Sequence, residues 1–349
     1  MIERILAGTD LAAALTVPVR AGLAALTAWA LVRAAGEPLI ARLKRAGVSE
    51  KTEKTPIEDS RLRRAIASKS GTPTMGGLIL LAGLLAGCGA WADLTSPLLP
   101  PVLGCVAAMA ALGLADDWLK LHGKGRTERG LKVRHKLLAQ GAAGAALALV
   151  LLRQGHGLRG WALPAALAWG ALVVATMSNA TNVTDGLDGL LAGLAAPAAA
   201  VLGGACWVAG TPAVAARLGI THVSGAAELA VFCASLAGAC AGFLHFNRHP
   251  ARVFMGDTGA MAVGGALAAV GLAAGQEVVM ALAGLVFLAE FGSSLLQIGA
   301  FRLLGRRVLP VAPMHHIFQR QGYPEPRIVM GFYLAGAAAA LIGLTSIGL

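Results

Sequence analysis

Two adjacent carboxylates mark the first run of residues that could act on a phosphate group. Asp116 and Asp117 stand at the end of an apolar stretch, in GLADDWLK. Neighbouring carboxylates at the edge of an apolar helix repel each other and are costly to desolvate, unless they share a cation or a metal ion. A helical salt bridge from Asp117 to Lys120 is the structural alternative, but it accounts for only one of the two acids. We therefore interpret the pair as functional.

A second acidic run places a polar side chain at every third position. In NATNVTDGLDG these are Asn179, Asn182, Asp185 and Asp188, which a helical or 3₁₀ turn would align on one face. Amides beside carboxylates suit ribose, uracil or metal-bound water, and the run contains no Lys or Arg to neutralise its acids. The alternative is that these residues are ordinary turn and cap formers.

A third candidate is Asp257, which lies between glycines in FMGDTG, ten residues after Asn247. A compact carboxylate with open backbone around it suits Mg²⁺, because this ion prefers one or two carboxylates together with phosphate oxygens. A lone capping aspartate is the alternative.

The run KSGTPTMGG, which begins at Lys69, predicts the start of a helix. Thr72 before Pro73 fits an N-cap followed by the first helical residue. The free N–H groups of such a helix start favour phosphate. A capped helix with closely packed glycines is the alternative.

Two neighbouring histidines form the last polar cluster. His315 and His316 stand in APMHHIFQ, before GYPEP. Adjacent histidines cannot share a helix face, so a helical zinc site with i, i+4 spacing is excluded. Imidazoles at this place suit pyrophosphate contacts or proton transfer, whereas an ordinary surface pair is the alternative.

Long apolar stretches separate these runs and must position them. Of the 349 residues, 56% are hydrophobic and 13% are charged, whereas a soluble domain has about 25% charged residues. Because a helix needs roughly 20 mostly apolar residues to cross a membrane, we expect an all-α integral membrane protein, a single polytopic domain over residues 1–349. About ten spans are predicted, at residues 17–36, 74–93, 98–116, 136–153, 161–178, 188–208, 226–245, 259–274, 277–301 and 327–347.

Basic residues indicate how the chain is oriented. Most Lys and Arg fall in the loops between spans one and two, three and four, seven and eight, and nine and ten. The positive-inside rule places these loops in the cytoplasm and both termini on the periplasmic side of a bacterial inner membrane. All the polar runs lie in a loop on the cytoplasmic side or at a helix end on that side. We therefore predict an active site that faces the cytoplasm.

Several functional classes are excluded or disfavoured. The basic loops explain the net charge of +11 without a nucleic-acid partner. The five cysteines lie in apolar stretches without ligand spacing and are expected to be small buried side chains. No Walker loop, G-x-S-x-G or H-E-x-x-H motif is present. Residues 1–20 carry charges and continue into the first span, so we expect them to belong to the mature protein.

Five runs together resemble the polyprenyl-phosphate N-acetylhexosamine-1-phosphate transferases. These are SGTPTMGG, GLADDWLK, NATNVTDGLDG, FNRHPARVFMGDTG and APMHHIFQRQGYPEP, which occur in the order of that family and extend from residue 69 to beyond residue 326. The similarity is greatest to the branch that acts on the muramoyl-pentapeptide nucleotide. Ile317 and Gln319 stand where the family usually has a third histidine and an acidic residue.

The resemblance implies a reaction and its participants. Undecaprenyl phosphate would attack the β-phosphorus of UDP-N-acetylmuramoyl-pentapeptide, with Mg²⁺ as cofactor, and release UMP with the first lipid intermediate of peptidoglycan synthesis. Membrane lipid and a second copy of the chain are the other expected partners, and nucleic acid is not.

The resemblance also assigns roles to the matching residues. Asp116, Asp117 and Asp257 are expected to be catalytic and to hold the metal. The expected substrate-binding residues are Lys69, Lys120, Lys136, Asn179, Asn182, Asp185, Asp188, Asn247, His315 and His316.

Alternatives remain for the step and for the substrate. The lipid phosphate would attack directly, with Asp116 as proton acceptor, or the enzyme would form a covalent aspartyl-phosphate first. Transfer of N-acetylglucosamine-1-phosphate for another surface polymer is the alternative activity. An inactive membrane scaffold or a transporter is the alternative from another class.

Overall fold

A computed structural model describes residues 16–49, 69–122, 130–156, 158 and 160–347. Within these residues the chain forms helices and connecting loops, and its β structure is a single antiparallel bridge between Ser49 and Pro73. The prediction of an all-α protein is confirmed for this part of the chain. Most of the N-terminal stretch expected in the mature protein, and parts of two basic loops, at 50–68 and 123–129, lie outside the described residues.

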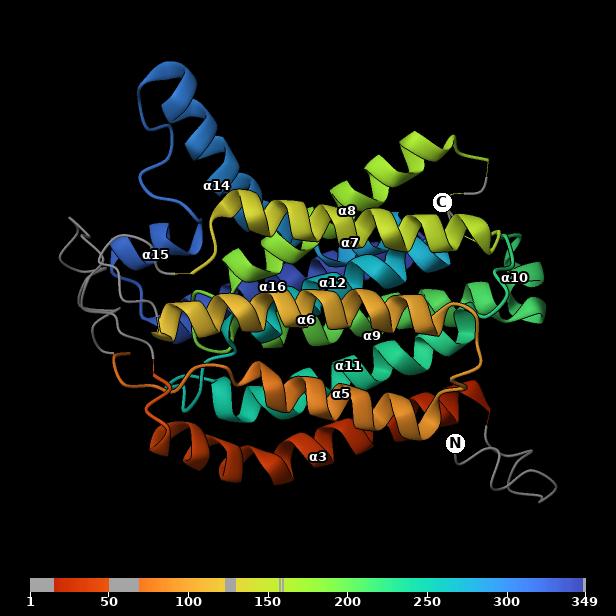
Figure 1. Cartoon of the computed structure of the whole chain (residues 1–349), viewed down its shortest axis with the longest axis horizontal. Coiled ribbons are helices and arrows are strands. Elements are labelled where there is room, and N and C mark those ends of the chain that lie inside the picture. Colours follow the sequence, from red (N-terminus) through yellow and green to blue (C-terminus); the bar gives the residue numbers. More distant parts are fainter. Residues whose placement is uncertain (1–15, 50–68, 123–129, 157, 159, 348–349) are drawn as a thin grey trace.

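Nine helices in the described part of the chain are long and apolar enough to cross a membrane. They are α3 (Val17–Arg45), α6 (Leu99–His122), α7 (Val133–Arg153), α8 (Leu163–Thr184), α9 (Leu190–Gly210), α11 (Ala226–Asn247), α12 (Gly256–Ala274), α14 (Leu285–Leu304) and α16 (Glu325–Thr345). Each overlaps one of the predicted spans, and the remaining predicted span, 74–93, is the shorter apolar helix α5 (Gly77–Trp91). The bundle in Figure 1 is therefore that of an integral membrane protein with several spans.

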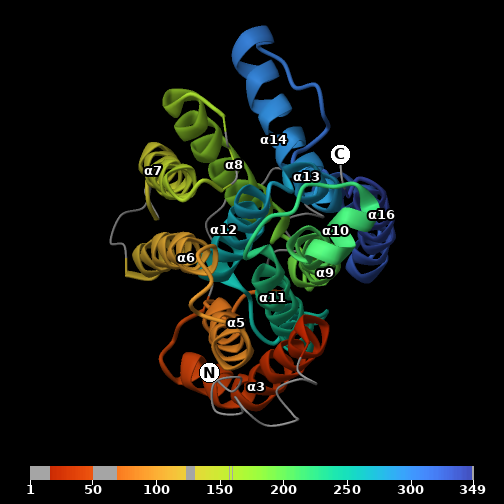
Figure 2. The same cartoon turned by 90° about the vertical axis from the view of Figure 1, so that its right-hand side faces the viewer.

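The predicted ninth span, 277–301, is two helices rather than one. Helix α13 (Glu277–Ala283) ends at Gly284, and α14 follows in another direction. Whereas α13 packs on α9 and α16, α14 leans on α8 and projects from the bundle (Figure 2). Glycine is a weak helix former, and a Cβ at position 284 would lie 2.9 Å from the carbonyl oxygen of Met280. The break at Gly284 allows α14 to leave the bundle.

The predicted helix start at Thr72 and Pro73 is wrong. This segment is extended and pairs with the chain before α12, since Phe254 N–H donates to the Pro73 carbonyl and Gly76 N–H donates to the Phe254 carbonyl, both at 2.8 Å. Met75 has a φ of 67°, which is incompatible with a helix. Helix α5 therefore begins only after Gly76. The Gly76 N–H is thus bonded within the protein.

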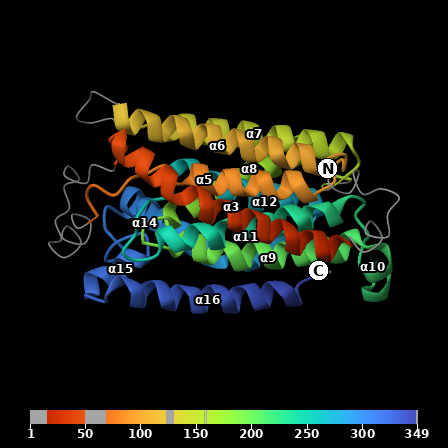
Figure 3. The same cartoon turned by 90° about the horizontal axis from the view of Figure 1, so that it is seen from below.

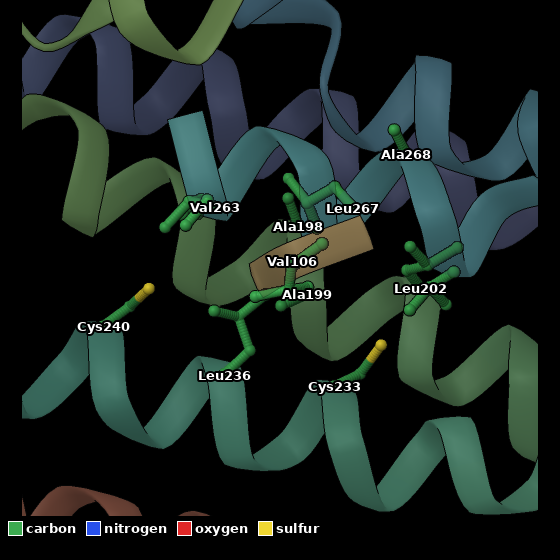
Figure 4. Packing of buried hydrophobic residues seen from close by; sticks show 14 of the residues in the cluster. Val106, Ala198, Ala199, Leu202, Cys233, Leu236, Cys240, Val263, Leu267 and Ala268 are labelled. Atoms are coloured by element: carbon green, nitrogen blue, oxygen red, sulfur yellow. The ribbon is translucent and has the colours of Figure 1, made fainter. Parts of the chain in front are cut away.

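Helix α12 lies at the centre of the bundle. Figure 2 shows it surrounded by α5, α6, α8, α9 and α11, and every one of its residues after the first is buried. Its Gly and Ala residues let neighbouring helices approach closely where lipid supplies no hydrophobic force between helices. In Figure 4, Val263 and Leu267 of α12 pack near Val106 of α6, Leu202 of α9 and Leu236 of α11. This packing fixes the position of the first turn of α12.

The two ends of the bundle differ in their chemistry. Figure 3 shows α15 (His315–Gln321) at one end and α10 (Pro212–Leu218) at the other. Helices α6 and α8 end near α15, and α5, α7, α12 and α16 begin there, so all the polar runs meet at that end (Figure 1). The five cysteines are free and buried, as predicted.

Candidate active site

Two aspartates and two lysines form a cluster of ion pairs at the α15 end of the bundle. Lys136 Nζ lies 2.7 Å from Asp116 Oδ2 and 2.8 Å from Asp257 Oδ2. Lys120 Nζ lies 2.8 Å from Asp116 Oδ2 and 2.8 Å from Asp257 Oδ1. Asp116 is fully buried, and its other oxygen accepts the Leu131 N–H at 2.6 Å. The end of α6 and the first turns of α7 and α12 thus bring four of the predicted site residues together.

Asp117 points to the start of α12 rather than to a lysine. Its Oδ1 accepts the N–H of Asp257 at 3.0 Å, and its Oδ2 accepts the N–H and the hydroxyl of Thr258 at 2.9 Å and 2.7 Å. The helical salt bridge between Asp117 and Lys120 is not the one that forms, because Lys120 pairs with Asp116, four residues earlier. Asp117 satisfies N–H groups that the helix leaves without partners, and it holds Asp257 at the centre of the bundle.

An Asp117→Asn substitution is expected to destabilise the protein and to lower its activity together. The asparagine carbonyl can replace one carboxylate oxygen, but its NH₂ group then faces a donor of Thr258. A buried donor without an acceptor costs about 1–3 kcal/mol. We expect a lower melting temperature of the purified protein and slower turnover. Lost activity at an unchanged melting temperature would instead place Asp117 in direct contact with the substrate or the metal.

Lys69 joins three segments that are far apart in the sequence. Its Nζ lies 2.8 Å from Asp188 Oδ1 and 2.6 Å from Glu325 Oε1, which also accepts the Asp188 N–H at 2.6 Å. Asp188 Oδ2 accepts the Ala251 N–H at 3.0 Å and lies 3.0 Å from His249 Nδ1. Asp188, the last acid of a run that lacks a basic neighbour in the sequence, is therefore neutralised by a lysine from another loop.

At the junction of Lys69, Asp188 and Glu325, which we call the Lys69 junction, ion pairing shifts the pKa values more than burial does. Burial disfavours the charged form of Lys69, but the charges of Glu325 and Asp188 raise its pKa above the ordinary value. Burial also opposes ionisation of Asp188, but the charge and the hydrogen bond of Lys69 lower the pKa of this carboxyl group. Both groups are thus ionised at neutral pH. The expected role of Lys69 in holding a phosphate requires it to leave at least one of its two carboxylates.

The remaining polar residues of α8 have different surroundings. Asn179 donates to Gln140 Oε1 on α7 and to the carbonyl of Ala175, both at 2.7 Å. Asn182 is half-buried on the same helix, whereas Asp185 is its C-cap residue. The helical face predicted for this run therefore ends before its last acid.

Asn247 supports the backbone near these residues. It is buried, its Oδ1 accepts the Gly189 N–H at 3.1 Å, and its Nδ2 donates to the carbonyl of Val253 at 3.0 Å. The side chain joins the end of α11 to the turn before α9. Its expected contact with the substrate stays a prediction.

The two histidines begin α15 and have different partners. His315 is buried, with its Nδ1 3.0 Å from Glu290 Oε2 on α14. His316 is half-buried, with its Nδ1 2.7 Å from Gln319 Oε1. Gln319 therefore accepts a hydrogen bond at a position where the sequence resemblance predicted an acidic residue. Burial and the neighbouring His315 lower the pKa of His316 to about 4, so its ring is neutral at pH 7.

A Gln319→Glu substitution is expected to raise the pKa of His316. A carboxylate in place of the amide favours the imidazolium form, by roughly 1–3 units for an opposite charge at this distance. A ¹⁵N NMR titration of the histidine rings in the two proteins measures the shift. The wild-type ring is expected to stay neutral down to about pH 5. Equal titration midpoints in the two proteins would contradict this account of Gln319.

Comparisons with known proteins show which family the sequence matches. The sequence profile described as Glycosyl transferase family 4 matches residues 99–275, and the phospho-N-acetylmuramoyl-pentapeptide-transferase signature 1 matches residues 69–81. A curated phospho-N-acetylmuramoyl-pentapeptide-transferase from Gluconacetobacter diazotrophicus is 39% identical, over 95% of this chain and 93% of the relative. This chain belongs to the phospho-N-acetylmuramoyl-pentapeptide-transferase family.

Other members of this family show similar agreement. The relatives of that name from Gluconobacter oxydans and Maricaulis maris are 40% and 35% identical, and each alignment covers 95% of this chain and 93% of the relative. The resemblance inferred from the motifs is therefore confirmed.

The magnesium ion expected for this family can be tested against the donor atoms of the site. Asp116 and Asp257 present carboxylate oxygens to the same two ammonium groups, so positive charge already lies between these two carboxylates. Carboxylate oxygens completed by substrate phosphate oxygens fit Mg²⁺. The oxygens of Asp117 are occupied by α12. Asp116 Oδ2 and both oxygens of Asp257 are paired with the flexible ammonium groups of Lys120 and Lys136, which can be exchanged for a metal ion, so Asp116 and Asp257 fit the ion better than Asp117 does.

A second group of possible ligands lies at the Lys69 junction. One ligand atom each of Asp188, His249 and Glu325 lies within 4.8 Å of the others. Lysine pairs with the carboxylates of both groups, so what distinguishes this one is its imidazole, which suits transition metals better than Mg²⁺. This group fits Mg²⁺ less well than the two aspartates do.

Three residues of the site were not assigned from the family motifs. Thr258 and Glu325 stand inside motif runs, but nothing in the sequence indicates that they bond to Asp117 and Lys69. Glu290 could have been identified from the sequence, because an isolated acid within an apolar span is costly and therefore needs a partner.

Proposed function

We propose that this chain transfers phospho-N-acetylmuramoyl-pentapeptide from its UDP conjugate to undecaprenyl phosphate and releases UMP. The observation that supports this most directly is the cluster of Asp116, Lys120, Lys136 and Asp257 at one end of a membrane-spanning bundle of this family. Phosphoryl transfer depends on positioning and on neutralising charge, and this cluster supplies both.

The transfer joins two polyanions, and the lysines reduce their repulsion. An oxygen of the lipid phosphate forms a bond to the β-phosphorus of the nucleotide. The bond from that phosphorus to the bridging oxygen breaks, and its electron pair leaves with UMP. Lys120 and Lys136 have flexible stems, so each can exchange a carboxylate partner for a phosphate oxygen. Asp257 and Asp116 would hold a Mg²⁺ ion, which would supply further positive charge.

The burial of the aspartates supports direct transfer. Asp116 is fully buried beneath both lysines, and both oxygens of Asp117 are hydrogen-bonded to α12. A nucleophile must reach phosphorus, and neither side chain can do so without leaving its partners. For the same reason we assign Asp116 to neutralising the lysines, in place of the proton acceptor expected from the sequence. A labelled phospho-sugar trapped on the protein in the absence of lipid would favour the covalent route.

The nucleotide is proposed to lie against the end of α8. Asn182 and Asp185 are half-buried there, next to the Lys69 junction. The location of the site at the α15 end, where the described parts of the basic loops also lie, supports a site facing the cytoplasm of a bacterial inner membrane, with both termini on the periplasmic side.

Release of UMP by the purified protein tests this function. The protein in lipid nanodiscs is supplied with undecaprenyl phosphate, Mg²⁺ and either UDP-N-acetylmuramoyl-pentapeptide or UDP-N-acetylglucosamine. We expect release from the muramoyl nucleotide only, loss of release when EDTA removes the metal, and recovery when Mg²⁺ is added back. Release from UDP-N-acetylglucosamine alone would identify the alternative transferase. No release from either would favour a scaffold or a transporter.

A further inference from the structure

Glu290 is a fully buried carboxylate in the membrane-spanning helix α14. Its Oε1 accepts the backbone N–H of His315 at 3.1 Å, and its Oε2 lies 3.0 Å from His315 Nδ1. A buried carboxylate is costly unless hydrogen bonds satisfy its oxygens. Both oxygens of Glu290 are satisfied by the same residue, so the pair joins α14 firmly to the start of α15.

The geometry of this pair determines where the proton of the His315 ring lies. A carboxylate oxygen that faces a ring nitrogen accepts its hydrogen bond, so Nδ1 carries the hydrogen. The other ring nitrogen, Nε2, is buried and has no hydrogen-bond partner among the described residues. A hydrogen on Nε2 would be a buried donor without an acceptor, which is unfavourable. The stable state is therefore the neutral ring with hydrogen on Nδ1 and a lone pair on Nε2.

The Nε2 atom of His315, which carries no hydrogen in this state, lies against the turn that follows α8. A Cβ added to Gly186 would collide with Nε2 and would lie 2.7 Å from Cε1 of the same ring. Gly186 stands between Asp185 and Leu187, in the turn that continues to Asp188. The absence of a side chain at position 186 thus lets the ring of His315 approach the backbone of this turn.

We propose that Glu290 is a positioning residue that fixes the Nδ1–H form of His315, and that the ring of His315 holds the Asp185–Asp188 turn in place. His315 then acts on the nucleotide only through this turn, whereas the less buried His316, whose ring lies 4.2 Å away, is left to contact the substrate. The inference rests on the proposed function in one respect, namely that this turn receives the nucleotide.

A Glu290→Gln substitution separates this role from a merely structural one. Its single carbonyl oxygen can accept the His315 backbone N–H, and its NH₂ group then faces Nδ1. The ring is expected to move its hydrogen to Nε2, where it points at Gly186. Glu277→Gln is the matched control, because it removes a partly buried glutamate from helix α13, outside this contact.

¹⁵N NMR of the histidine-labelled protein reads the ring form directly, with His315 assigned by its loss in a His315→Asn protein. We expect the Nδ1–H form in the wild type and in Glu290→Asp, and the Nε2–H form or a mixture in Glu290→Gln. The Nε2–H form in the wild type, or an unchanged ring in Glu290→Gln, overturns the proposal. This measurement needs no nucleotide, so it is independent of whether the protein is a transferase.

Steady-state kinetics then tests the effect on the turn. Glu290→Gln and Gly186→Ala are both expected to raise KM for the nucleotide about tenfold, the loss of roughly one hydrogen bond, with a smaller change in kcat. Glu277→Gln should leave both constants unchanged. A fall in kcat at constant KM would show that His315 acts in the chemical step and would overturn the positioning role.

Discussion

An Asp257→Asn substitution is expected to reduce the rate of UMP release by about a hundred- to a thousandfold, the usual effect of removing one group that stabilises charge in a transition state. Asparagine has nearly the shape of aspartate but no charge, so Lys120 and Lys136 would share the single carboxylate of Asp116. The expected metal would lose one of its two direct ligands. Initial rates of UMP release at saturating Mg²⁺ measure the effect.

The fold is expected to survive this change. The start of α12 is held by the side chain of Asp117 through backbone N–H groups, and the side chain of Asp257 takes no part in those bonds. Asp93→Asn is a suitable control, because Asp93 lies after the far end of α5 and accepts from Thr95. If the Asp257→Asn protein released UMP at the wild-type rate, Asp257 would not take part in the reaction, and the scaffold alternative would be favoured.

A Gly113→Ala substitution is expected to inactivate the protein from a position that has no chemistry of its own. A Cβ at Gly113 would collide with the carbonyl group of Asp257 and would lie 2.7 Å from the Cα of Thr258. Because these are backbone atoms, α6 and α12 would have to move apart. Overpacking of this kind costs about 1–3 kcal/mol. The separation would also lengthen the bonds from Asp117 that hold Asp257.

The same helix offers a matched control for this substitution. A Cβ added to Gly104 would meet no atom of the described residues within 4 Å, so Gly104→Ala should leave both the melting temperature and UMP release close to the wild-type values. We expect Gly113→Ala to lower both. Similar behaviour of the two variants would show that close approach of α6 and α12 is not needed to hold Asp257.

The sequence predicted the spans and the gathering of polar runs well, because both depend on local composition. An apolar stretch of the right length has few alternatives in a membrane. The break at Gly284 was missed because the apolar stretch continues through it. What determines the break is the packing of α13 on α9 and α16, which are distant in the sequence.

The partners of each acid could not be predicted in the same way. Asp116 and Asp117 are adjacent, yet one faces lysines and the other faces the start of α12, since consecutive residues of a helix point in different directions. The motifs identified both residues as important but could not distinguish a charged partner from a capped backbone. The helix start predicted at Thr72 and Pro73 was wrong for a similar reason. The local sequence favours a helix there, but the segment pairs with the chain before α12 instead.

The contact between Lys69 and Glu325 also affects how the enzyme is made. These residues are 256 positions apart, and Asp188 lies between them in the sequence. A ribosome therefore completes the segments with Asp116, Asp188 and Asp257 well before Glu325 emerges at the start of α16. Until α16 inserts, Lys69 and the Asp188 N–H lack their shared acceptor, so the nascent protein already contains these three aspartates before the contact with Glu325 can form. Membrane insertion of α16 is thus the step that closes this junction during synthesis.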